Sequence, residues 1–233
     1  MQPMSLLIVT CVLFVGSHLV LSHPLRGGLA GRLGERGFMI VYSVVAIATF
    51  ILIVQAWRGM PPEPPLWVVD DPLWILASLI VLAASILFMG SLIGNPALPA
   101  PHAARDAEAA PRGVFAITRH PMMWGFALWA FAHAMVMPTG GQIVLSATII
   151  FLALVGSAGQ DVKKARLMGD AWRNWAARTS FVPFARQVGG AAPWRETIPR
   201  PHALFGGILL WLVATWAHGA LGYIAAGMWR WIG

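Results

Sequence analysis

Runs of apolar residues about twenty long alternate with polar loops along the whole chain. About 20 apolar residues cross the hydrocarbon of a bilayer as a helix, so each run predicts one membrane span. We expect six spans, at residues 4–22, 38–57, 73–93 and 119–137, a fifth that ends near residue 155, and a sixth at 203–223. The pattern therefore predicts an all-α, polytopic membrane helical bundle, which we treat as a single transmembrane domain over residues 1–233.

The breaks between the runs indicate how the spans are connected. Gly94-Asn95-Pro96 is a strong helix breaker that ends the third run, and the Ala- and Pro-rich residues 95–118 predict a mobile loop. The short turn at residues 138–141 implies that the fourth and fifth spans are antiparallel neighbours. We interpret residues 4–22 as a span rather than a cleaved signal peptide, because no charge precedes them and no small-residue cleavage site follows.

Residues 160–178 have a different pattern. One set of positions recurs at spacings of three and four residues and is apolar, namely Val162, Ala165, Met168, Trp172 and Trp175. The positions between them carry Lys163, Lys164, Arg166, Arg173 and Arg178. This alternation predicts one interfacial amphipathic helix whose Trp face lies at the acyl boundary of the membrane.

Composition and charge agree with a membrane protein and exclude other classes. The chain is 58% hydrophobic and only 11% charged, with a mean hydropathy of +0.70, which a soluble domain of this length would not have. The net charge of +7 comes from basic residues in the loops, so we expect membrane lipids and no nucleic acid as partners. Cys11 is the only cysteine and is expected to be a free, buried thiol.

The distribution of Lys and Arg predicts an orientation. The loops after the first, third and fifth spans carry nearly all of these residues, whereas the loops after the second and fourth carry Arg58 alone. Positive loops face the cytoplasm, so both termini are expected on the outer side. In a bacterium this means a multi-pass protein of the inner (cell) membrane with periplasmic termini.

The histidines are the candidate functional residues. His18, His133 and His218 fall within three different spans, where polar side chains are costly and are usually functional. A neutral imidazole is an axial ligand of haem iron, and two helices that present one histidine each form a low-spin site. The alternative is a histidine that is hydrogen-bonded to a neighbouring carbonyl or Trp within the bundle.

Arg119-His120-Pro121 opens the fourth span. Pro121 is expected in the first helical turn, where a missing N–H is tolerated. His133 follows His120 by thirteen residues, roughly 20 Å along a helix, so these two side chains cannot bind one metal together. Arg119 and His120 could bind an anionic group such as a haem propionate, or Arg119 could only anchor the helix among the headgroups.

Several motifs together resemble a known family. His18 is followed by LGER at 33–36, ITRHPMMWG at 117–125, Ala132-His133 and RTSFVPF at 178–184. In this order and approximate spacing they resemble NnrU-type membrane proteins and, through them, the 15-cis-zeta-carotene isomerases of plants and cyanobacteria. The resemblance covers most of the chain.

The resemblance implies a cofactor and a role. The carotene isomerases are haem b enzymes with a bis-histidine ferric state, and the positions of their two ligands match His18 and His133. NnrU proteins are associated with nitrite and nitric oxide reduction. The isomerases also have a cysteine three residues before the second ligand, proposed as a replacement ligand, where this chain has Ala130. Ligand switching of that kind is therefore not expected here.

The expected topology leaves the ligand pair open. His18 falls in the cytoplasmic half of the first span and His133 towards the periplasmic end of the fourth, yet axial nitrogens on one iron lie about 4 Å apart. The rival pairs are His133 with His218 and His18 with His120.

Arg-His-Pro also resembles the RHPxYxG motif of isoprenylcysteine carboxyl methyltransferases, which bind S-adenosylmethionine. This chain has Met123 at the Tyr position and Asp161 without a Glu pair, which favours a shared scaffold without methyl transfer.

We therefore expect a haem b protein with a redox role in nitrite and nitric oxide metabolism, for which a respiratory or nitrogen-oxide reductase is the candidate partner. The alternatives are a haem-dependent cis-trans isomerase of a carotenoid-like polyene, a membrane methyltransferase, and a non-catalytic subunit that supports assembly. Whether the chain is an enzyme is left open by its sequence.

Overall fold

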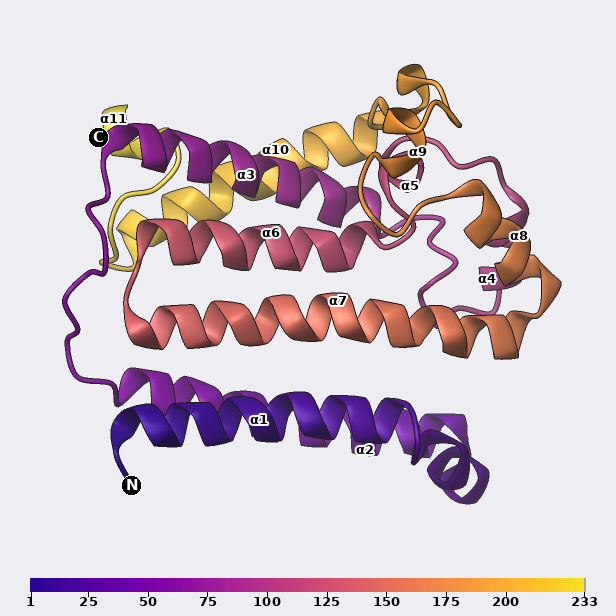
Figure 1. Cartoon of the computed structure of the whole chain (residues 1–233), viewed down its shortest axis with the longest axis horizontal. Helices are drawn as coiled ribbons and strands as arrows, with labels where there is room; N and C mark the ends of the chain where they lie inside the picture. Colours follow the sequence, from indigo (N-terminus) through magenta and orange to yellow (C-terminus); the bar gives the residue numbers. More distant parts are fainter. Residues whose placement is uncertain (233) are drawn as a thin grey trace.

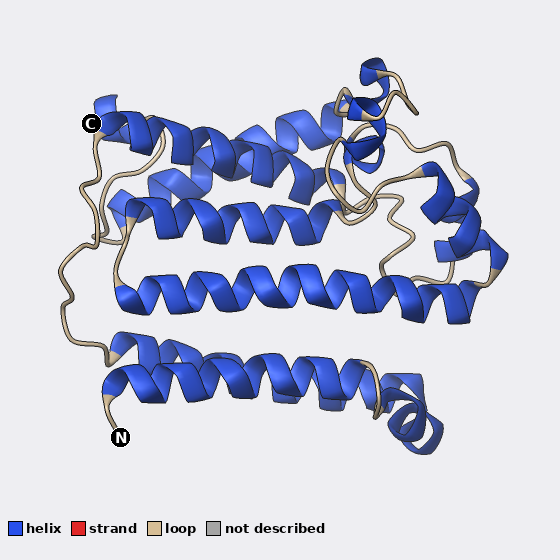
Figure 2. Ribbon diagram, in the orientation of Figure 1, coloured by secondary structure: helices blue, strands red, loops and turns tan. Residues whose placement is uncertain are grey.

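The structure is a computed structural model that describes residues 1–232, and it contains helices and connecting segments without a strand among these residues (Figure 1 and Figure 2). The long helices are α1 (Pro3–Ser22), α2 (Arg26–Arg58), α3 (Asp71–Gly90), α6 (Pro121–Val136), α7 (Gly140–Met168) and α10 (Pro201–Ala220). The short ones are α4 (Ala103–Glu108), α5 (Val114–Ile117), α8 (Asp170–Arg178), α9 (Ala185–Val188), the 3-10 helix η1 (Trp194–Thr197) and α11 (Trp229–Ile232).

Each long helix corresponds to one predicted span, but two of them are longer than predicted. Helix α2 begins at Arg26, within the loop expected before residue 38, and is interrupted at Gly34 (φ 69°), while α7 continues to Met168, well past residue 155. Five of the long helices have the length and apolar composition needed to cross a membrane. The remaining helix, α6, is apolar but has only 16 residues, about 24 Å at 1.5 Å per residue. The prediction of a polytopic helical bundle is confirmed, with a fourth span that is shorter than expected.

The long helices lie side by side, and the two chain ends lie at the same end of the bundle (Figure 1). Helix α3 packs against both α6 and α10, and α6 packs in turn against α7. Helices α1 and α2 form a hairpin that meets α7 through α1. Helices α6 and α7 are antiparallel neighbours, as the short turn at 138–141 predicts. The short helices α4, α5, α8 and α9 gather at the opposite end, which we call the loop-rich end.

Small residues allow the central helices to approach closely. A Cβ atom added at Gly207 of α10 would lie 2.6 Å from the Cα atom of Ile86, and one added at Gly125 of α6 would lie 2.9 Å from the carbonyl oxygen of Ala84. Helices in lipid gain packing contacts when small side chains let their backbones come together. Glycine at these two positions therefore fixes the spacing of α6 and α10 on α3.

Large apolar side chains cover the outside of the bundle. On α2, Ile40, Val44, Ile47 and Ile51 recur at three- and four-residue spacing and are all exposed. Such a stripe on a span is the surface that contacts lipid. Cys11 is buried between α1 and α2 and is free, as expected.

The segment predicted as a mobile loop is folded instead. Residues 95–118 contain α4 and α5, and Asn95, Ala97 and Ala107 are buried. The buried Lys164 of α7 donates from Nζ to the carbonyl oxygens of Pro96 and Leu98, at 2.9 and 3.0 Å. The prediction failed because an Ala- and Pro-rich composition does not reveal contacts with distant helices.

The predicted interfacial helix at 160–178 is also corrected. Its first half continues α7, and Gly169, at φ 57°, separates α7 from α8. Trp172 and Trp175 are 1% and 2% exposed and pack in a protein core with Phe115, not in the acyl boundary. An apolar helix face has the same spacing whether protein or lipid covers it, and here α4 and α5 provide the cover.

Candidate functional site

Two motifs that are far apart in the sequence meet at the start of α6. The Arg119 N–H donates to the Ser180 carbonyl oxygen at 2.8 Å, and the Phe184 N–H donates to the Ile117 carbonyl oxygen at 2.9 Å. The Thr118 hydroxyl and the Trp124 indole both donate to the Phe181 carbonyl oxygen, at 2.7 and 2.9 Å. Residues 117–121 and 178–184 therefore form one hydrogen-bonded unit, with Pro121 in the first helical turn as expected.

Asp161 near the end of α7 binds both Arg119 and His120. The Arg119 Nε atom lies 3.0 and 2.9 Å from the two carboxylate oxygens, and His120 Nε2 lies 2.8 Å from Oδ1. The Asp161 side chain is 20% exposed, that of Arg119 16%, and that of His120 is fully buried beside Trp172 and Phe181. The guanidinium that could bind a propionate is thus engaged by a carboxylate of the chain itself.

The sequence had singled out Asp161 only as a departure from a methyltransferase motif. Its pairing with Arg119 spans 42 residues, and the available signal was only that a basic segment contains two acidic residues, Asp161 and Asp170. Because a carboxylate accepts, His120 carries its proton on Nε2 when neutral. His120 Nδ1 is buried without a hydrogen-bond partner among residues 1–232.

His133 and His218 come together near the last turns of α6 and α10, at the end of the bundle that carries the chain termini. Their ring centres are 6.2 Å apart with an angle of 34° between the rings. In each, Nδ1 bonds the carbonyl oxygen four residues earlier, Trp129 for His133 and Ala214 for His218, at 2.8 Å. A carbonyl oxygen can only accept, so Nδ1 carries the proton and Nε2 keeps its lone pair in the neutral ring.

His18 lies elsewhere. Its Nδ1 bonds the Phe14 carbonyl oxygen at 2.8 Å, and its ring contacts Phe14 and Tyr42, with centres 4.2 and 5.4 Å away. Met4 lies beside Gly140, where α7 begins at the end of the bundle that carries the chain termini. His18 is fourteen residues further along α1, or roughly 21 Å from that end.

His133 is only three residues from the end of α6 on the side of the chain termini, so the structure does not bring His18 and His133 together. It does not join His18 to His120 either, since the His120 ring lies beside Trp172 and Phe181. The ligand pair implied by the family resemblance stays a prediction.

A cleft of about 710 Å³ opens beside the histidine pair. Its walls are mainly apolar and come from α2, α6 and α7, and include Phe50, Ile53, Trp57, Trp129, Leu145 and Ile149. Arg58 and Glu63 stand among its polar lining residues, and Glu63 accepts from the Gly141 N–H at 2.8 Å. Binding pockets for small molecules typically have this size and this largely apolar lining.

The cleft reaches the histidine pair through two of its lining residues. The Trp129 ring contacts the His133 ring with centres 4.2 Å apart and an angle of 41° between the ring planes. Tyr223 also lines the cleft, and its N–H donates to the His218 carbonyl oxygen at 2.8 Å. No sequence pattern could have revealed this cleft, because α2 and α6 are separated by more than sixty residues.

Residues 1–232 contain no group of three or more His, Cys, Asp or Glu side chains that could hold a metal ion. This finding concerns sites in which the protein supplies most ligands. A haem iron takes four nitrogens from the porphyrin and needs only one or two from the protein, which a histidine pair can provide.

Comparison with known proteins identifies relatives. The family model described as NnrU protein matches residues 6–226. The chain is 30% identical over 90 residues to the chloroplastic 15-cis-zeta-carotene isomerase of Zea mays, and 32% identical over 92 residues to that of Arabidopsis thaliana. Each match covers 39% of this chain and about a quarter of the relative, 24% and 23%. No solved structure matches.

Proposed function

The chain belongs to the NnrU protein family, and from this premise we propose that it is an integral membrane protein that binds haem b and has a redox role linked to nitrite and nitric oxide metabolism. The metabolic role rests on what the family resemblance implies. The haem rests on residues of this chain, foremost the pair formed by His133 and His218.

The spacing of this pair fits two axial ligands. Each axial nitrogen lies about 2 Å from a metal and the ring centre about 1 Å behind it, which separates the two ring centres by about 6 Å. The observed separation is 6.2 Å. In both residues Nδ1 is held by a carbonyl oxygen, which orients the ring and leaves Nε2 as the donor atom, the arrangement found at metal-binding histidines.

The surroundings of the pair suit a large apolar group. Trp129 and Tyr223 connect the pair to the apolar cleft, and Arg58 at the cleft is a cation that could face an anionic substituent. Bound haem would supply a one-electron redox centre. The two histidines would hold and orient it, and the aromatic residues would keep water from it.

Haem content measured in histidine variants tests this proposal. We expect a low-spin b-type spectrum and about one haem per chain in the detergent-purified protein, measured as the pyridine haemochrome. His133→Ala and His218→Ala should each lose at least about nine tenths of the haem or change its spin state, whereas His18→Ala should keep both.

The His18→Ala control also distinguishes the proposed ligand pair, His133 with His218, from the pair His18 with His133. Loss of haem in His133→Ala and His18→Ala, with retention in His218→Ala, would replace the proposed pair by the one that the family resemblance implies. A colourless protein after growth with ample haem would refute haem binding altogether.

A second candidate function is cis-trans isomerisation of a carotenoid-like polyene. The names of the two relatives and the apolar walls of the cleft favour it. Ala130, in place of the family's cysteine, speaks against ligand switching during such a reaction. Incubation of the reduced protein with a 15-cis polyene, followed by chromatography of the isomers, tests the activity.

Two further candidates have distinct tests. S-adenosylmethionine binding by calorimetry would support a methyltransferase, although Arg119 and His120 are engaged by Asp161. Copurification of a stable reductase subunit would support a role in assembly.

We also propose a location in the bacterial inner membrane with both termini in the periplasm. The end that carries the chain termini holds few basic residues, while the loop-rich end holds most of the Lys and Arg. This distribution supports a cytoplasmic loop-rich end.

A further inference from the structure

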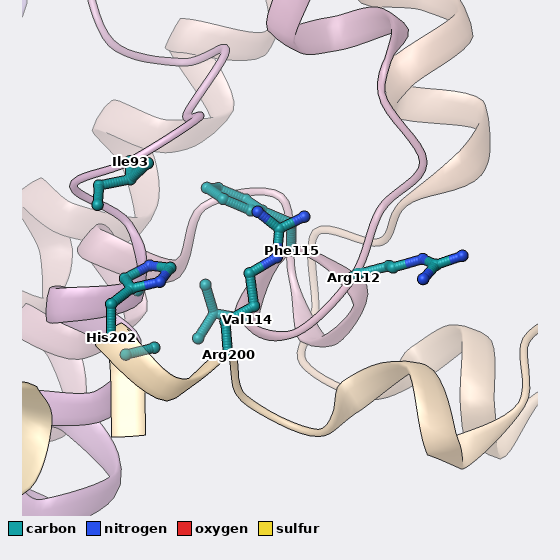
Figure 3. A pocket seen from close by; sticks show the side chains of 8 residues that line it. Ile93, Arg112, Val114, Phe115, Arg200 and His202 are labelled. Carbon is teal, nitrogen blue, oxygen red and sulfur yellow. The ribbon is translucent and has the colours of Figure 1, made fainter. Parts of the chain in front are cut away.

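Three basic side chains surround a small hollow at the loop-rich end of the bundle. Arg112 precedes α5, and Arg200 and His202 begin α10, and all three line the hollow. Figure 3 shows Arg200 beside Phe115, with His202 on one side and Arg112 on the other, its guanidinium directed outward. Apolar and small residues complete the lining, and no acidic residue belongs to it.

These basic groups have no partner of opposite charge. Within residues 1–232, neither guanidinium takes part in a side-chain hydrogen bond or an ion pair; the ion pairs of the chain lie elsewhere. His202 Nε2 is buried without a hydrogen-bond partner. Like charges that share one surface repel each other unless an anion lies between them, so this arrangement favours an anion.

The backbone adds to this preference. Arg200 is the N-cap of α10, a helix of 20 residues whose first residue, Pro201, has no N–H, and Ala203 of its first turn also lines the hollow. The aligned peptide dipoles of a helix place partial positive charge at its start. The hollow itself is only about 10 Å³, so an anion of phosphate size would lie outside it beside Arg200 and His202, and the exposed end of the Arg112 side chain would turn toward the anion.

The apolar surface next to the hollow indicates which anion is bound. Phe205 and Leu209 follow His202 at helical spacing on α10 and are 68% and 62% exposed, and Ile93 after α3 is 58% exposed. Ile93 lines the hollow itself, and Phe205 and Leu209 continue the exposed apolar surface along α10 away from it. A molecule with a phosphate group and long apolar chains would bind both surfaces at once.

We propose that Arg112, Arg200 and His202 form a binding site for the phosphate group of an anionic phospholipid, whose acyl chains lie along the exposed face of α10. Arginine forks bind phosphate oxygens through paired hydrogen bonds, and basic pockets between spans on the cytoplasmic side bind anionic lipid headgroups. The site does not depend on haem.

Native mass spectrometry and thermal unfolding of the purified protein test the site, with cardiolipin as the probe and phosphatidylcholine, which is zwitterionic and has no net charge, as the comparison. The site variant is Arg112→Gln/Arg200→Gln/His202→Gln. The matched control is Arg32→Gln/Arg36→Gln/His102→Gln, which removes the same residue types at exposed positions that do not line the hollow.

We expect cardiolipin to bind at least about tenfold more weakly to the site variant and to lose its stabilising effect, with less than about threefold change in the control. Arg200→Gln alone should weaken binding about threefold, and it changes only one exposed side chain. This single variant keeps the test valid if the triple variant does not fold.

Three results would overturn the proposal. Equal weakening in the site variant and the control would mean general attraction by charge. Equal binding of phosphatidylcholine, whose phosphate is offset by a quaternary ammonium, would mean that the site does not select an anionic lipid. Stabilisation by inorganic phosphate at the same concentration as by cardiolipin would assign the site to the free ion.

Discussion

The Asp161 side chain binds Arg119 and His120, which lie 42 and 41 residues earlier in the sequence. Its carboxylate accepts hydrogen bonds from Arg119 and His120 and is largely removed from water. Removal of one partner from a buried ion pair leaves the other charge uncompensated, and this costs far more than the loss of an exposed pair. The interaction fixes the start of α6 to the end of α7.

We expect Asp161→Asn to lower the free energy of unfolding by roughly 3 kcal/mol, because it leaves the Arg119 guanidinium without its counter-charge. Denaturant titration in detergent measures this change. Asp170→Asn is the matched control, since Asp170 also pairs with an arginine but in an exposed position, with 87% of its side chain exposed. The control should cost at most about 0.5 kcal/mol. Equal losses in both variants would contradict a structural role for Asp161.

The histidines illustrate what a single residue can and cannot specify. His18, His133 and His218 each bond the carbonyl oxygen four residues earlier through Nδ1, which any helix permits. Each therefore presents Nε2 to its surroundings. Whether another imidazole lies opposite depends on the neighbouring helix, and only α6 and α10 bring two of these rings within 6.2 Å.

Among the elements, α3 forms the centre against which α6 and α10 pack. The close approach depends on glycine, because even one methyl group at Gly207 would overlap the Ile86 backbone. A backbone cannot move aside as the end of a flexible side chain can. The helices would have to separate, which would also displace His218 relative to His133.

Gly207→Ala should destabilise the protein by about 1–3 kcal/mol, as overpacking of a tight interface does. Gly16→Ala is the control, because nothing lies within 4 Å of a Cβ at Gly16 and alanine favours the helix by about 0.5–1 kcal/mol. The midpoint of thermal unfolding in detergent should therefore fall for Gly207→Ala and stay or rise for Gly16→Ala. An unchanged midpoint for Gly207→Ala would mean that α10 can shift without cost.

On the scale of the whole molecule, the chain passes along the bundle an even number of times, so its two ends lie together (Figure 1). The same arrangement separates the two sites. The histidine pair and its cleft lie at the end that carries the termini, and the basic residues around Arg200 lie at the loop-rich end. A bound redox group and an anionic lipid would thus occupy opposite faces of the membrane.

Cysteine labelling tests this orientation. In a Cys11→Ser background, Leu66→Cys lies between α2 and α3 and Val188→Cys lies at the end of α9, and both native side chains are exposed. A maleimide that cannot cross membranes should label Leu66→Cys in intact cells with a permeable outer membrane, and Val188→Cys only after lysis. The reverse pattern would mean that the termini are cytoplasmic.

The sequence alone determined the class of the molecule, the approximate positions of its six long apolar helices and the histidines that three of these helices carry. Such features depend on local hydrophobicity and on turn residues, which are encoded within a short stretch of chain. The tertiary structure decided the rest. It placed Asp161 on Arg119 and His120, buried Trp172 and Trp175 beneath residues 95–118, and brought His133 to His218 instead of His18. These are contacts between distant segments, and they depend on how close each helix can approach its neighbours, which the periodicity of one helix does not specify.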